Sequence, residues 1–212
     1  MIYAENIFLC IAAPVLLSLI FLRKNARRFV LFFLTGMGVC LLGAYISGFM
    51  LKTAGLAEDE TAIFISPIVE EILKLLPLLF FLFVFVPTDE AFLDAAIGIG
   101  VGFATFENCC YILSAGAESL PYILIRGLAV GVMHLVCATA VSLGLILARR
   151  HRMLSIPGIA GSLALSMIFH ALYNLLVSQE GISSYIGYAL PILAAAGLYA
   201  AYHTELKKRN NQ

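Results

Sequence analysis

Five side chains that can act as acids, bases or metal ligands lie inside strongly apolar stretches of this chain. They are Glu70, Glu71, Glu107, His134 and His170. A carboxylate at bilayer depth costs roughly 2.5–3.5 kcal/mol on insertion scales, so two adjacent glutamates in such a stretch indicate a function. Carboxylates held close together in a low dielectric suit a general base. Two histidines with carboxylates suit zinc with an open position for water, although the chain has no HExxH motif.

Three further polar residues can support these five groups. They are Lys74, Asn108 and Asn174. Lys74 comes four residues after Glu70 and can pair with it on a helix, and Asn174 shares a helical face with His170. The two adjacent glutamates point about 100° apart on a helix, so one can face a cavity while the other supports it. The competing interpretation is structural, because a Glu–Lys pair can join helices and a buried histidine can be a satisfied core residue.

The composition is that of a polytopic membrane protein. Of the 212 residues, 62% are hydrophobic, and the mean hydropathy is +0.99, against about 45–50% apolar residues in soluble domains. The formal net charge is zero, which gives no electrostatic case for nucleic-acid binding. We expect one all-α membrane domain over residues 1–212. A membrane-spanning helix needs about 20 apolar residues, and seven segments qualify: roughly 2–22, 29–51, 62–86, 91–115, 122–148, 153–177 and 184–203.

Basic residues are concentrated on one side of this seven-helix map. Ten of the 13 Lys and Arg residues follow the first, fifth and seventh segments, and these connections share one side if the helices alternate. Because cytoplasmic loops carry an excess of Lys and Arg, the map predicts a multi-pass protein of the cell membrane with its N-terminus outside and its C-terminus in the cytoplasm. Arg126 lies near the outer end of its segment, and we expect its side chain to extend to the membrane interface.

The same map places the five ionisable groups in one layer. At about 1.5 Å per residue, they lie roughly 10–18 Å below the outer surface, on four different helices. Groups from four helices that share a depth can meet in one cavity. We therefore expect a four-helix catalytic core, over about residues 60–180, that joins Glu71, Glu107, His134 and His170 in the outer half of the bilayer.

Four short motifs in this core resemble those of the PrsW family of intramembrane proteases. They are EEILK at 70–74 for Glu-Glu-x-x-Lys, FATFEN at 103–108 for Phe-x-x-x-Glu-Asn, His134 on the next segment, and HALYN at 170–174 for His-x-x-x-Asn. More remotely, the chain resembles the superfamily of type II CAAX prenyl endopeptidases and Abi-type immunity proteins. Those relatives have a histidine where this chain has Glu107, and usually an arginine after the glutamate pair. These departures favour the PrsW branch.

The resemblance implies an endopeptidase that makes a first, extracytoplasmic-side cut in a single-pass membrane protein, such as an anti-sigma factor in stress signalling. On this interpretation Glu71, helped by Glu70, activates water. The two histidines stabilise the oxyanion with one of the two asparagines, and Glu107 completes the site.

Two questions stay open from the sequence. A mechanism that uses glutamate alone needs no metal, whereas a bound zinc ion has Glu71, Glu107, His134 and His170 as candidate ligands. The rival functions are a proton- or solute-coupled transporter, in which buried Glu and His relay protons, and a catalytically inert Abi-like binding or immunity protein. The chain shows no internal repeat, which weighs against a transporter built from inverted repeats.

Overall fold

The part of the chain that the computed structural model describes, residues 4–115, 119–150 and 155–210, is helical throughout apart from short connections. Its elements are α1 (Ala4–Ser18), α2 (Lys24–Ala54), α3 (Glu58–Glu60), the π-helical turn η1 (Thr61–Ile65), α4 (Ser66–Phe85), α5 (Asp89–Ala115), α6 (Leu120–Arg150), α7 (Ser155–Val177) and α8 (Ile182–Asn210). No strand occurs in these residues. The predicted all-α class is confirmed.

Five of the described helices are long and apolar enough to cross a membrane: α2, α5, α6, α7 and α8. Helix α4 has 20 residues as well, but Glu70, Glu71 and Lys74 lie within it. Helix α1 is apolar and shorter, with 15 residues. The chain is a polytopic membrane protein, and the segments expected at about 2–22 and 62–86 correspond to α1 and α4.

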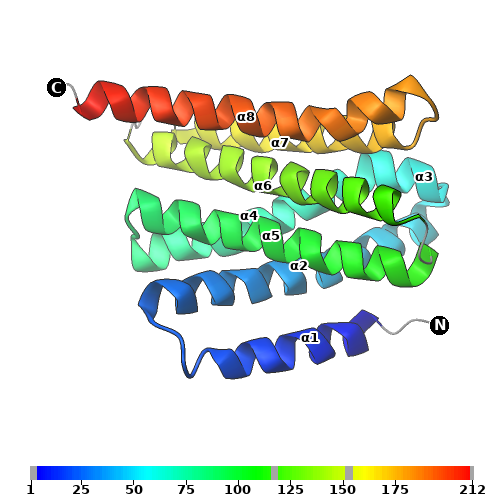
Figure 1. The fold of residues 1–212 in the computed structure, drawn as a ribbon, viewed down its shortest axis with the longest axis horizontal. Helices are drawn as coiled ribbons and strands as arrows, with labels where there is room; N and C mark the ends of the chain where they lie inside the picture. The colour runs from blue at the N-terminus through cyan, green and yellow to red at the C-terminus, as the bar shows by residue number, and fades with distance from the viewer. Residues whose placement is uncertain (1–3, 116–118, 151–154, 211–212) are drawn as a thin grey trace.

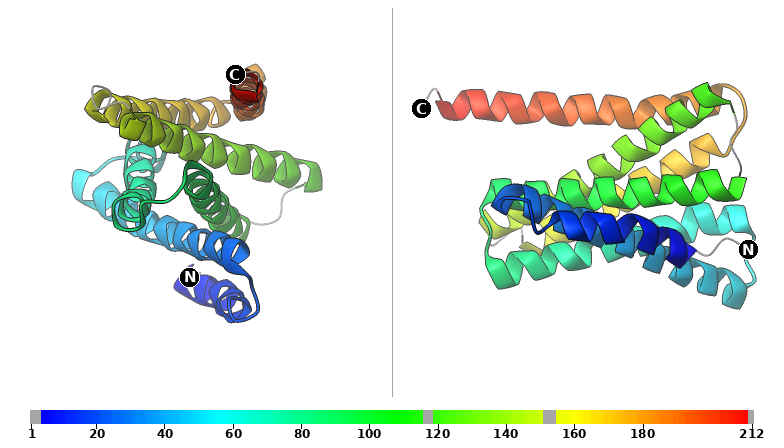
Figure 2. Two further views of the ribbon diagram at one scale, coloured as in Figure 1. Left: turned by 90° about the vertical axis from the view of Figure 1, so that its left-hand side faces the viewer. Right: turned by 60° about the horizontal axis from the view of Figure 1, so that its bottom comes forward.

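The long helices run side by side and alternate in direction (Figure 1). The α1–α2 and α4–α5 connections and the ends of α6 and α8 lie at one end of the molecule, which we call the basic end. There, Arg149 and Arg150 both pair with Asp89, at the start of α5. The basic connections thus share one end, as the seven-segment map predicts, although Arg152 lies outside the described residues. Figure 2 shows α1 and α8 on opposite faces of the bundle, with α8 against α6 and α7.

Helices α2 and α5 make the most extensive contact in the bundle. Glycines on both helices permit it: a Cβ at Gly102 would lie 2.0 Å from the carbonyl oxygen of Phe33, and one at Gly36 would lie 2.2 Å from that of Ile99. Gly98 and Gly102 have the small-xxx-small spacing that favours such close helix packing. Helix α2 therefore fixes the position of α5, which carries part of the site.

Toward the basic end, α4, α5 and α6 enclose an apolar cluster without a charged side chain. Its buried members are Leu75, Leu78, Leu82, Phe92, Ala95, Ala96, Ile99, Ala138, Val141, Leu145 and Ile146. On α4 the same buried face carries Glu71 and Lys74 directly before Leu75. The apolar cluster therefore locks together the three helices that hold most of the polar groups.

Candidate active site

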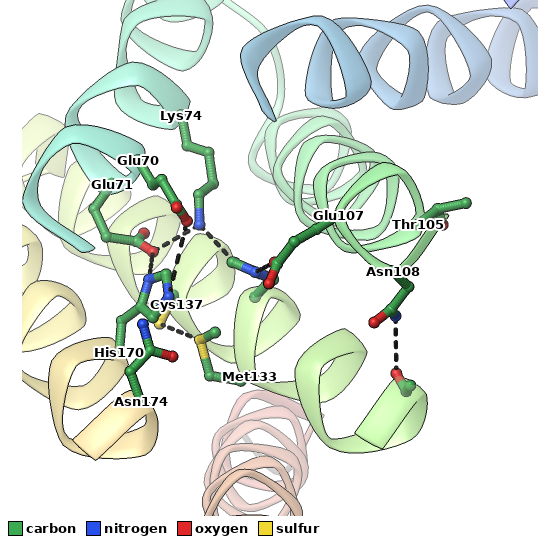
Figure 3. A network of polar contacts seen from close by, with 12 residues as sticks. Glu70, Glu71, Lys74, Thr105, Glu107, Asn108, Met133, Cys137, His170 and Asn174 are labelled. Carbon is green, nitrogen blue, oxygen red and sulfur yellow. Dashed lines mark hydrogen bonds and ion pairs between the residues drawn. The ribbon is translucent and has the colours of Figure 1, made fainter. Parts of the chain in front are cut away.

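Four helices bring the five ionisable groups and Lys74 into one network (Figure 3). Helix α4 supplies Glu70, Glu71 and Lys74, α5 supplies Glu107, α6 supplies His134, and α7 supplies His170. Four of these six side chains are almost fully buried, and none of the four is more than 2% exposed: Glu71, Lys74, His134 and His170. At that depth each polar atom needs a partner within the protein.

Lys74 lies at the centre of this network. Its Nζ donates to Glu71 Oε1 at 2.6 Å and lies 2.8 Å from His134 Nδ1. The sequence suggested a pair with Glu70, four residues earlier, whereas the structure pairs Lys74 with Glu71, three residues earlier. Because an ammonium group only donates hydrogen bonds, Nδ1 of His134 accepts here, and the ring proton of the neutral imidazole is on Nε2.

Each histidine presents one ring nitrogen to a carboxylate. His134 Nε2 lies 2.5 Å from Glu107 Oε2. His170 Nδ1 lies 2.9 Å from Glu71 Oε1, and its other nitrogen, Nε2, lies 3.8 Å from Glu70 Oε2. The two rings meet edge to face, with their centroids 5.0 Å apart. A carboxylate accepts only, so it fixes both the tautomer and the orientation of the histidine that it contacts.

Two carboxylate oxygens of the network are buried without a hydrogen-bond partner among the described residues. They are Oε2 of Glu70 and Oε2 of Glu71. A buried carboxylate oxygen is costly unless a proton, a cation or a polar substrate group meets it. These two atoms are therefore the ones available for binding and for proton transfer.

The two predicted supporting asparagines contact neighbouring helical segments. Nδ2 of Asn174 donates to the carbonyl oxygen of Ala62 in η1 at 2.9 Å. Nδ2 of Asn108 donates to the carbonyl oxygen of Gly127 on α6 at 3.3 Å. Both amides thus hold the segments around the network together. Their part in oxyanion stabilisation stays a prediction.

Sequence reasoning missed one residue that contacts the network. Arg126 was expected to extend to the membrane interface, but its Nη2 lies 3.8 Å from Glu107 Oε1, and its Nη1 donates to Asn108 Oδ1 at 2.6 Å. A signal for this contact was present in the sequence. On two consecutive antiparallel helices, Glu107 and Arg126 lie within about two helical turns of the connection between them, and their charges are opposite.

Carboxylates and histidines buried together among membrane-spanning helices are the groups that acid–base or metal-assisted hydrolysis inside a membrane requires. The model of the PrsW family intramembrane metalloprotease matches residues 24–200, which include all four helices of the site. The chain belongs to this family, as its motifs predict, and it is an intramembrane protease. No curated protein and no solved structure matches the chain.

The donor set fits the metal ion that the family description implies. Glu70, His134 and His170 each offer one ligand atom, and these three atoms lie within 4.8 Å of one another. Two imidazoles and a carboxylate form a set that zinc accepts, with a fourth position left for water. The unpartnered Oε2 of Glu70 is the atom in this set that most needs a positive partner.

The other two carboxylates of the network contact the ring nitrogens of the same two histidines that would point away from the metal ion. Glu107 meets Nε2 of His134, and Glu71 meets Nδ1 of His170. Carboxylates in such positions orient metal-binding histidines and raise their basicity. The geometry thus favours Glu70 as the carboxylate ligand, where the sequence suggested Glu71 and Glu107.

Proposed function

We propose that this protease makes the first cut in a single-pass membrane protein, close to the extracytoplasmic surface. The observation that carries the proposal is the group of Glu70, His134 and His170 beside Glu71. Glu70 and Glu71 lie in the first two turns of α4, which starts at the end of the bundle away from the basic end. His170 is the eighth residue from the end of α7, which corresponds to a depth of about 10 Å. A bond cut there lies in the outer part of a substrate's membrane segment.

The orientation is inferred from charge. Among the described residues, the helix ends and connections at the basic end carry most of the Lys and Arg residues. Such connections stay in the cytoplasm, so the N-terminus and the site lie toward the outside. An anti-sigma factor in stress signalling is the kind of single-pass substrate that the resemblance to the family suggests.

The metal ion would be held by Glu70, His134 and His170. When bound, it polarises the scissile carbonyl and lowers the pKa of a water molecule. Glu107 and Glu71 keep the two imidazoles in the tautomers described above, so that each ring can offer its other nitrogen. Nδ1 of His134 accepts from Lys74 at 2.8 Å, so the ammonium would have to move aside, toward Glu71, for this nitrogen to bind the ion.

Glu71 is the proposed general base. Its Oε1 is held by Lys74 at 2.6 Å and by His170 at 2.9 Å, which leaves Oε2 to take the proton of the attacking water and return it to the leaving amine. The Lys74 ammonium neutralises a carboxylate that is only 1% exposed, which a buried charge requires. Water and the substrate backbone reach the network on the side of Glu107, whose side chain is 34% exposed.

The experiment that tests this function compares new N-termini in membranes of cells that produce either the wild type or Glu71→Gln. Mass spectrometry of N-terminal peptides should find single-pass membrane proteins that only the wild type cuts, with each cut in the outer half of the membrane segment. Glu58→Gln is the matched control, because Glu58 lies exposed on α3. Cells that produce Glu58→Gln should yield the same new N-terminal peptides as cells that produce the wild type.

Two results contradict the proposal. One is a set of new N-termini that is identical for the wild type and Glu71→Gln at equal protein abundance. The other is cleavage confined to the cytoplasmic half of the substrates' membrane segments. This result would overturn the proposed orientation but would still show proteolysis.

A further inference from the structure

Arg126 contacts the polar network from outside it. It lies on α6 near Leu120, the first residue of that helix, and its guanidinium reaches across to α5. We propose that Arg126 is a positioning residue for proteolysis, which holds the carboxylate of Glu107 so that Glu107 in turn holds the ring of His134. This inference rests on the proposed function and adds a residue that none of the four sequence motifs contains.

Glu107 connects Arg126 to the network because its two oxygens have different partners. Oε1 lies 3.8 Å from Nη2 of Arg126, and Oε2 lies 2.5 Å from Nε2 of His134. A carboxylate held from both sides has a fixed rotation. Without Arg126, only the histidine contacts Glu107, so the carboxylate on the Nε2 side of the ring can rotate, and Lys74 alone holds the ring from the Nδ1 side.

The charge of Glu107 points to the same role. His134 is neutral when its Nδ1 accepts from Lys74, so the histidine does not neutralise Glu107. Among the described residues, Glu107 has ion-pair contacts with His134 and Arg126. Because His134 is neutral here, Arg126 is the partner that balances the negative charge of Glu107. A carboxylate within a membrane helix is retained when such a partner is present.

Arg126 is itself held in place more firmly than a side chain that merely extends to the interface. Its Nη1 donates to Asn108 Oδ1 at 2.6 Å, and Asn108 in turn donates to the Gly127 carbonyl oxygen. The guanidinium lies over the ring of Tyr111, 3.4 Å from its centroid, and the hydroxyl of Tyr111 is 3.2 Å from that of Tyr122. A planar guanidinium is suited to two partners and a ring at once, whereas a lysine ammonium is not.

The test replaces Arg126 by Gln and compares it with Arg28→Gln. Arg28 is a matched control, because it also pairs with a carboxylate on α5, Asp94 at 3.3 Å, but at the basic end. In proteoliposomes that contain a substrate found by the N-terminal comparison, Arg126→Gln should lower kcat by about 10-fold, the lower end of the range for removing a partner that orients a metal-binding histidine, because Arg126 acts through Glu107. KM should stay within about twofold, because no substrate contact is lost. Arg28→Gln should keep the kcat of the wild type.

Arg126→Lys separates positioning from charge. It keeps the positive charge but not the arrangement with two partners, so its kcat should fall between those of the wild type and Arg126→Gln. The proposal is overturned if Arg126→Gln matches Arg28→Gln, or if its loss of kcat equals its loss of folded protein. Where Arg126→Gln does not accumulate, Arg126→Lys decides: a lowered kcat at unchanged KM supports the proposal, and a wild-type kcat overturns it.

A second measurement tests the contact between Arg126 and Glu107, on which the proposal depends, without any substrate. The Tm shifts of Arg126→Gln, Glu107→Gln and the double variant form a double-mutant cycle. If Arg126 holds Glu107, the shift of the double variant is smaller than the sum of the two single shifts. Additive shifts show that the residues are uncoupled and overturn the proposal. If the wild type cuts no membrane protein, the proposed function is wrong. The double-mutant cycle still tests whether Arg126 holds Glu107.

Discussion

Helices α4, α5 and α6 meet in two regions that are built in opposite ways. Toward the basic end they pack through the apolar cluster, with Leu78, Phe92 and Leu145 no more than 1% exposed. In the other half, the same helices also bring together charged and polar groups, of which Glu71 and His134 are as deeply buried. On α4 the change from one region to the other occurs between Lys74 and Leu75, which are adjacent in the sequence.

The apolar cluster and the polar network differ in how specific their contacts are. Each contact in the apolar cluster is weak and can be supplied by many side chains of similar volume. Each contact in the polar network has a specific partner, and the loss of one partner leaves a buried charge behind. We therefore expect substitutions in the polar network to abolish activity or folding, and substitutions in the apolar cluster to reduce stability without changing the chemistry.

The largest effect is expected within the glutamate pair. Glu71→Gln removes the proposed base, so cleavage should fall by about 10²–10⁴-fold or more. Stability should fall as well, because the buried Lys74 ammonium loses its carboxylate partner, although the amide oxygen of Gln can still accept from Nζ. Cleavage in proteoliposomes, measured beside protein abundance, checks this. Glu71→Gln should keep its bound metal and Glu70→Gln should lose it, which sharpens the division of roles. Loss of the metal in Glu71→Gln and its retention in Glu70→Gln would exchange the proposed roles of base and metal ligand between the two residues.

Lys74→Met is expected to have the largest effect on stability. It leaves the buried carboxylate of Glu71 without its ammonium partner, which typically costs about 3–5 kcal/mol. Unfolding in detergent, followed by loss of helical signal, measures this change. Lys52→Met is the control, because Lys52 is exposed in the last turn of α2 and should change stability by less than about 0.5 kcal/mol. Equal stabilities of the two variants would show that the polar network does not need its central cation.

In the apolar cluster, Leu78→Ala should cost about 2 kcal/mol or more through the cavity that it leaves. The matched variant is Leu76→Ala, because Leu76 lies on the same helix and is 54% exposed, whereas Leu78 is 1% exposed. The fraction of Leu78→Ala that remains folded should have the same kcat as the wild type. A specific loss of kcat in Leu78→Ala would break the proposed separation of packing from chemistry.

A smaller effect is expected where α2 meets α5. Gly102→Ala places a Cβ 2.0 Å from the Phe33 carbonyl oxygen, so the helices must separate, at a cost of about 1–2 kcal/mol. Gly131→Ala is the control, because no atom lies within 4 Å of its Cβ position and alanine favours the helix. A lower Tm for Gly102→Ala and an unchanged or higher Tm for Gly131→Ala are expected. The same Tm for both would contradict the close packing.

The helices could be predicted from the sequence because apolar length determines them. The expected segment 29–51 lies within α2, and 122–148 lies within α6. The start of α4 could not be predicted as well. The expected boundary near 62 falls instead at Ser66, where Pro67 occupies the first turn after η1. Proline favours the first turn of a helix, but a preceding π-helical turn leaves no distinct sequence signal.

The meeting of the site residues could be predicted from depth, and their pairing could not. Lys74 is four residues from Glu70 and three from Glu71, and both spacings permit a pair on a helix. The contact between His170 and Glu71 decides between them, and it depends on how α7 packs against α4. Arg126 was misjudged for the same reason, because its partner depends on how α6 lies against α5.

The proposed function depends most on a metal centre formed by Glu70, His134 and His170 within the polar network. X-ray absorption spectroscopy of the purified protein in lipid nanodiscs tests it most directly. We expect one metal ion per chain with two imidazole nitrogens and a carboxylate oxygen at about 2.0–2.2 Å, as for zinc. The ion should be lost in Glu70→Gln and in His170→Ala and kept in Glu58→Gln. Undiminished cleavage by protein that has been stripped of metal and assayed in chelator would contradict the claim.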